Sequence, residues 1–121
     1  DLPGGRLTLN ARSTRSLIEV IRSGGYDGVS FDTLIALLSP EVRIIDPVGV
    51  RQWQHATLGA IQRETEAAIW LLAHDNAQGR AVSGTMDWAN FGRLVLHLER
   101  TEGELRLTAT KDNTGFPFGR I

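Results

Sequence analysis

The sequence of 121 residues contains no cysteine, which excludes disulfides, thiolate catalysis and cysteine-ligated metal sites. No apolar run approaches the length of about 20 residues that crosses a bilayer, and no signal peptide is recognisable. We therefore expect a cytoplasmic protein without membrane contact. A block of like charge is also missing. The 13 basic and 14 acidic residues are spread along the chain and nearly balance each other. Nucleic-acid binders need a basic face, so nucleic acid is not an expected partner.

What is present fits one globular domain over residues 1–121. Hydrophobic residues make up 41% of the chain and charged residues 22%, which is ordinary for a folded protein. A chain of this length buries roughly two thirds of the surface that its unfolded form exposes, so it can hold a core without cross-links. We expect residues 1–12 to form a tail or a short strand and residues 113–121 to form a C-terminal loop.

Apolar residues at helical spacing predict three helices in the first half of the chain. A hydroxyl of Ser13 or Thr14 is the expected N-cap of the first helix, and Pro40 is expected to end the second. A short strand, Val42–Ile45, is predicted between the second and third helices. The apolar faces are Leu17, Ile18 and Ile21, then Phe31, Leu34, Ile35 and Leu38, then Ala56, Leu58, Ala60 and Ile61.

Alternating apolar and polar residues predict an antiparallel meander over 82–88, 94–98 and 105–109, with a turn at Glu102-Gly103. Residues 68–74 fit a strand or an extension of the third helix, and we favour a strand from about Ala67. A sheet with one apolar face must be covered, and the helices are the available cover. The predicted fold is therefore α+β, with N-terminal helices packed on a curved, mainly antiparallel sheet. This cone-like α+β barrel would leave a cavity at its open end.

Two passages resemble the nuclear transport factor 2 superfamily and, within it, the SnoaL-like cyclases and isomerases. They are YDGVSFDTLIALLSPEVRIIDP (26–47), similar to that family's second helix and first strand, and GELRLTATKD (103–112), similar to its final strands. The resemblance implies the cone-shaped fold and a pocket for a small molecule. The chain departs from the family between Pro47 and Ala56, where a second strand is usual.

A second resemblance concerns the histidine-kinase-type ATPase domains. GRLVLHLERTEGELRLTATKDNTGFPFG (92–119) is similar to their strand pair and glycine box, and GGRLTLNARSTRSLIEVIRSGG (4–25) looks similar as well. The family needs glycines where this chain has Thr114 and Phe116, so the resemblance implies a degenerate module that does not hydrolyse ATP.

Candidate site residues are sought by chemistry, because the phosphate-loop, zinc-protease and serine-hydrolase motifs are all missing. If 68–74 is a strand, His74 shares a face with Trp70 and can transfer protons at neutral pH. Asp46 would end the short strand at the mouth of the cone. The expected catalytic residues are Asp46, His74 and His55, and the expected ligand-binding residues are Trp53, Trp70, Met86 and Trp88. The competing interpretation is structural, with the aromatic and methionine side chains in the core and Asp46 beginning an Asp-Pro turn.

Two classes of function follow from these residues. The first is binding of an apolar small molecule, with or without cofactor-free isomerase, cyclase or dehydratase chemistry; neither a metal nor a cofactor is expected. The alternative is a protein-interaction or signalling adaptor module, including a degenerate ATPase-like domain. Asp87 and His97 would meet on the polar face of the meander, which we expect to form a homodimer surface.

Overall fold

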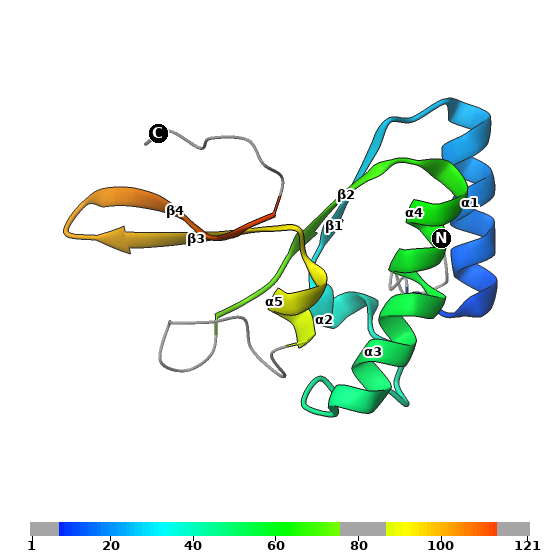
Figure 1. The fold of residues 1–121 in the computed structure, drawn as a ribbon, viewed down its shortest axis with the longest axis horizontal. Coiled ribbons are helices and arrows are strands. Elements are labelled where there is room, and N and C mark those ends of the chain that lie inside the picture. The colour runs from blue at the N-terminus through cyan, green and yellow to red at the C-terminus, as the bar shows by residue number, and fades with distance from the viewer. Residues whose placement is uncertain (1–7, 76–86, 114–121) are drawn as a thin grey trace.

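The computed structural model describes residues 8–75 and 87–113, and it combines helices with strands in an α+β fold (Figure 1). The predicted loop at the C-terminus and most of the predicted N-terminal tail lie outside these ranges. The elements in chain order are α1 (Ala11–Gly24), β1 (Gly28–Asp32), α2 (Leu34–Leu37), α3 (Pro47–Ala56), α4 (Leu58–Thr65), β2 (Ala68–Leu72), α5 (Asp87–Phe91), β3 (Leu94–Thr101) and β4 (Glu104–Asp112).

Helix α1 confirms the first predicted helix, although its N-cap is Asn10 rather than Ser13 or Thr14. The Asn10 side chain accepts hydrogen bonds from the amides of Arg12 and Ser13, each at 2.9 Å. Ser13 Oγ accepts in return from the Asn10 amide at 2.9 Å, which completes a capping box. Residues 11 and 12 are consequently helical rather than part of a tail. The helix ends at Gly25, whose φ of 63° is the left-handed conformation that glycine adopts without strain.

The second predicted helix is confirmed only over α2, Leu34–Leu37, because residues 28–32 form the strand β1. This strand pairs in parallel with β2, Gly28 opposite Ala68 and Asp32 opposite Leu72. Phe31 is buried and belongs to the inner face of the strand. The helical spacing of Phe31 to Leu34, Ile35 and Leu38 is local, whereas the pairing with a distant strand that determines the structure is not visible in a short window.

The predicted strand Val42–Ile45 is also wrong, since these residues form turns. The Val42 amide donates to the Ser39 carbonyl, and the Asp46 amide donates to the Arg43 carbonyl. The third predicted helix is present but divided into α3 and α4 at Thr57. The Thr57 hydroxyl is buried and donates to the Trp53 carbonyl at 2.7 Å, so the break is hydrogen-bonded internally.

The predicted strand at 68–74 is confirmed as β2, and the last hairpin is confirmed as β3 and β4. The hairpin is antiparallel, and its turn residues Glu102 and Gly103 both have positive φ, as type I′ turns require. The predicted strand 82–88 is contradicted at its end, because Asp87 and Trp88 begin the helix α5; residues 82–86 lie outside the described residues.

The expected cone-like barrel is not confirmed, because the sheets formed by the described residues are small and not closed. In the described ranges β1 pairs with β2 and β3 pairs with β4, and these are two separate two-stranded sheets. Figure 1 shows the β3–β4 hairpin extending away from the helices. The core lies between α1, α3, α4 and the inner face of β1; its most buried side chains are Leu9, Ile18, Leu34, Val50, Leu58 and Ile61. No helix in the described part of the chain is long and apolar enough to cross a membrane.

Candidate functional site

The two tryptophans expected in a ligand pocket, Trp53 and Trp88, pack against each other in the core. Their ring centroids are 5.8 Å apart with planes at 70°, an edge-to-face arrangement. Both are nearly inaccessible to solvent. Each indole nitrogen donates to a carbonyl, that of Trp53 to Leu9 at 2.9 Å and that of Trp88 to Ile44 at 3.3 Å. These contacts give both residues a structural role, and their binding of a ligand stays a prediction.

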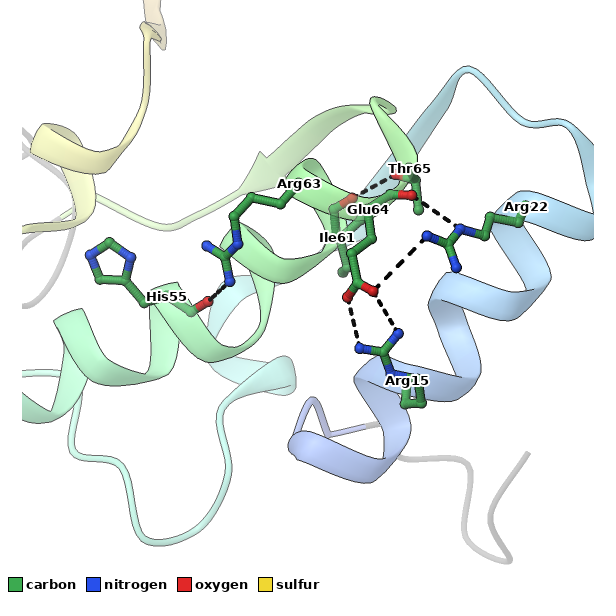
Figure 2. A network of polar contacts seen from close by, with 7 residues as sticks. All are labelled: Arg15, Arg22, His55, Ile61, Arg63, Glu64 and Thr65. Atoms are coloured by element: carbon green, nitrogen blue, oxygen red, sulfur yellow. Dashed lines mark hydrogen bonds and ion pairs between the residues drawn. The ribbon is translucent and has the colours of Figure 1, made fainter.

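The other expected site residues lie on different elements. Asp46 is the N-cap of α3, where its carboxylate accepts from the Val48 amide at 3.2 Å. His55 is exposed on α3, and its carbonyl accepts from Arg63 (Figure 2). Trp70 is 59% exposed on the outer face of β2, and His74 is exposed just beyond that strand. Met86 lies outside the described residues. The structure thus brings together Trp53 and Trp88 among the predicted residues.

An open apolar hollow of about 430 Å³ lies elsewhere, beside α2 and the turns that follow it. None of the predicted site residues lines it. Its polar lining residues are Thr8 and Ser39, and the Ser39 hydroxyl donates to the Leu9 carbonyl at 2.9 Å. The hollow therefore offers no acid–base group; its lining residues are Thr8, Ile35, Leu38, Ser39, Pro40, Val42 and Ile44.

Three polar residues lie at or just beyond the carboxyl ends of β1 and β2. Because the strands are parallel, their carboxyl ends meet at the same place, where Asp32 ends β1 and His74 and Asp75 follow β2. We call Asp32, His74 and Asp75 the carboxyl-end site. In open α/β sheets, ligands bind outside the carboxyl ends of the strands, because the loops there are free to contact them. Helices α2, α3 and α4 lie between the two strands in sequence, as in a parallel crossover unit.

A histidine from the hairpin reaches this same end of the sheet. His97 Nε2 lies 2.8 Å from Asp75 Oδ2, and the two side chains are 21% and 40% exposed. His97 was expected to face Asp87, but Asp87 lies on α5 and its carboxylate is 3.9 Å from Arg51. In residues 8–75 and 87–113 no three acidic or histidine side chains converge closely enough to hold a metal ion by themselves. A cation at this end would need further oxygen ligands from water or from a bound molecule.

Sequence reasoning found His74 but missed Asp32. The signal was available, because the apolar runs GVSF and AIWLL are each followed within three residues by an aspartate or histidine. Reading residues 31–38 as a helix made Asp32 a possible helix cap instead of a residue at a strand end. The error in secondary structure therefore concealed Asp32, one of the three residues of the candidate site; Asp75 was also not among the predicted site residues.

The charge cluster on the helices is structural rather than part of this site (Figure 2). Arg15 Nη1 and Nη2 donate to the two carboxylate oxygens of Glu64, each at 2.8 Å, and join α1 to α4. Arg22 Nε adds a bond to the Glu64 carbonyl at 3.1 Å. The hydrogen bond from Arg15 lowers the pKa of Glu64 below its ordinary value, although partial burial opposes the shift. The same pair raises the pKa of Arg15, so both groups stay ionised at neutral pH.

Comparison with known proteins leaves the chain without an assigned family. No protein-family model matches it, and neither a curated protein nor a solved structure matches it. The two resemblances noted in the sequence stay expectations, and the function must be argued from the geometry.

Proposed function

We propose that this domain binds a small phosphorylated molecule, together with a divalent cation, at its carboxyl-end site. The observation that supports the proposal is the parallel pairing of β1 with β2, which puts Asp32 beside the residues following β2. Binding outside the carboxyl ends of parallel strands is the general rule for open α/β sheets, and dinucleotides and flavin mononucleotide are among the ligands bound there. The proposal keeps the expected small-molecule function but replaces the apolar ligand by a polar one.

The charge at this end determines what kind of ligand fits. Asp32 and Asp75 are exposed carboxylates, which repel a bare phosphate. A magnesium ion removes this conflict, because it binds one or two carboxylates and completes its octahedral shell with water and substrate phosphate oxygens. The imidazole of His74 would donate a hydrogen bond to the same ligand.

The expected acid–base enzyme with Asp46, His55 and His74 receives less support. Asp46 is engaged in capping α3, and His55 lies on the exposed surface of that helix. A shared pocket for these three residues stays a prediction, as do the SnoaL-like relationship and the cytoplasmic location.

The test is titration of the ¹⁵N-labelled protein with Mg·ATP, followed by NMR. We expect shift changes at Asp32, Thr33, His74 and Asp75. Asp32→Asn should weaken binding about 10- to 100-fold, which corresponds to the loss of one charge-assisted contact. Asp27→Asn is the matched control, because Asp27 is an exposed aspartate at the opposite end of the same strand. Equal losses in both variants, or shifts confined to the apolar hollow, would contradict the proposal.

A second candidate function, self-association, is favoured by the exposed apolar face of the hairpin. Leu98 and Leu105 are 61% and 65% exposed, and Leu107 is 40% exposed. In the described ranges β4 pairs with β3 alone, so its outer edge is available for another strand. We propose that this strand is β4 of a second copy, which would extend the two hairpins into one antiparallel sheet.

The sequence of β4 is compatible with pairing to itself about a two-fold axis at Leu107. This register puts Arg106 opposite Thr108 and Leu105 opposite Ala109 of the second copy, so no like charges face each other between Glu104 and Thr110; Asp112 would meet Glu102 only at the end of the paired strands. Sedimentation equilibrium should detect a dimer that Leu107→Lys abolishes, with His55→Lys as an exposed control on α3. A monomer at every protein concentration would exclude this arrangement.

A further inference from the structure

The outer face of the β1–β2 sheet is apolar and exposed. Its inner face belongs to the core, through Val29, Phe31, Ile69 and Leu71. Because successive side chains of a strand point to opposite faces, the register puts Ala68, Trp70 and Leu72 together on the outer face. Trp70 is 59% exposed and Leu72 is 49% exposed. A large aromatic side chain therefore lies in solvent at the centre of this sheet face.

The charge of the two strands and their flanking residues is entirely acidic. Residues 26–33 and 66–74 contain Asp27, Asp32 and Glu66, and they contain no lysine or arginine. All three acidic residues are exposed, and none of their carboxylates forms an ion pair or hydrogen bond within the described part of the chain. A cationic ligand complements this charge, whereas a free anion would be repelled.

Asp32 is the acidic residue that the register places on the outer face beside Trp70. Asp32 pairs with Leu72, and Ser30 pairs with Trp70, so Asp32 is the diagonal neighbour of Trp70. A strand separation of about 4.8 Å and a rise of about 3.3 Å per residue put the two Cα atoms about 8 Å apart. A guanidinium group suits this pair, because its flat surface stacks on an indole ring while its edge donates hydrogen bonds to a carboxylate.

We propose that the outer face of the β1–β2 sheet binds an arginine-containing peptide in an extended conformation. In the described ranges β2 pairs with β1 alone, so its other edge can accept a further strand. Alternate side chains of that strand would point to the outer face. An arginine would then cross Trp70 toward Asp32, and apolar residues two positions before and after it would cover Ala68 and Leu72. The inference does not depend on phosphate binding at the carboxyl-end site.

The probe is a blocked heptapeptide, acetyl-Ser-Val-Thr-Arg-Thr-Val-Ser-amide, titrated into the ¹⁵N-labelled protein at low salt and followed by NMR. We expect shift changes at Ser30, Leu72 and both the amide and the indole N–H of Trp70. A peptide with citrulline in place of arginine has the same shape without the charge. It should bind about 10-fold more weakly, because it loses both the cation–π contact and the ion pair.

Two protein variants locate the arginine. Trp70→Leu should weaken binding about 3- to 10-fold, because leucine keeps apolar surface but provides no π system. Asp32→Asn should weaken binding about 10-fold, because it removes the charge that pairs with the guanidinium. Glu41→Gln is the matched control, since it removes one exposed negative charge outside the sheet. It should leave the affinity unchanged within about twofold.

The outcomes that would overturn the proposal differ from those that concern Mg·ATP. Absence of shift changes with the arginine peptide, or equal affinity for the citrulline peptide, would refute it. An equal loss in Glu41→Gln and Asp32→Asn would reduce the effect to general charge attraction, which is also a refutation. Displacement of the peptide by equimolar spermidine would assign the face to a small organic cation instead. Trp70→Leu should leave any Mg·ATP shifts at Thr33 and His74 unchanged, so the two sites can fail separately.

Discussion

Replacing Trp53 by phenylalanine tests whether this residue is structural rather than part of a pocket. The side chain is 5% exposed, and its Nε1 donates to the Leu9 carbonyl at 2.9 Å. Phenylalanine keeps a ring against Trp88 but loses this bond, at a net cost of about 1 kcal/mol. The smaller ring adds about 1 kcal/mol through lost packing. The Leu9 oxygen still accepts from Ser39 Oγ, so no buried acceptor is left unpaired.

We therefore expect the free energy of unfolding to fall by about 2 kcal/mol for Trp53→Phe and by about 4 kcal/mol for Trp53→Ala. Urea denaturation followed by far-ultraviolet circular dichroism measures both changes without depending on tryptophan emission. Trp70→Phe is the control, because Trp70 is 59% exposed and surface substitutions usually change stability by less than about 0.5 kcal/mol. If Trp53→Phe cost no more than this control, the buried position and the hydrogen bond described for Trp53 would be refuted.

Two further predictions concern α1. Thr14→Val should raise the free energy of unfolding by about 1 kcal/mol. The Thr14 hydroxyl is buried without a hydrogen-bond partner among the described residues, and valine has nearly the same shape. A decrease in the same urea assay would mean that the hydroxyl has a partner. Glu64→Gln should destabilise the protein at neutral pH, because it removes the carboxylate that binds Arg15. Since the pKa of Glu64 is lowered by folding, its contribution is present above its ordinary value of 4.5 and is lost as the pH falls through the lower folded value. The stability difference between the original protein and Glu64→Gln should consequently shrink on acidification below about pH 4.5, whereas a difference that is constant with pH would contradict the role of this ion pair.

The parts of the fold that the sequence predicts correctly are those with local signals. Strands β3 and β4 alternate strictly and flank a glycine-containing turn, and α1 has a continuous apolar face between a capping residue and Gly25. The parallel pair was missed because its pairing is long-range: Gly28 must meet Ala68. Phe31 happens to lie at helical spacing from Leu34, so a local pattern concealed the strand. Only the partner strand decides between the two structures at this position.

The candidate site was predictable only in part, because it depends on one strand with a local signal and on one strand whose pairing is long-range. His74 follows β2, a strand that was expected, whereas Asp32 is the last residue of β1, which was not expected. Trp53 and Trp88 were candidates because ligand pockets are lined predominantly by hydrophobic and aromatic side chains, which also fill cores. What separates the two roles is the environment of the indole nitrogen, which here donates to the carbonyl of Leu9 or Ile44. Sequence periodicity contains no information about those partners.

The tight turn at Glu102 and Gly103 has a consequence for the order of folding. It joins strands that are adjacent in the chain, so their association requires little loop-closure entropy and occurs in about 1–10 μs for typical hairpins. The pairing of Gly28 with Ala68 must instead wait until the helices between them have collapsed together. We therefore expect the β3–β4 hairpin to form before β1 pairs with β2. Pulsed hydrogen exchange during refolding would reveal this order as early protection of the β4 amides.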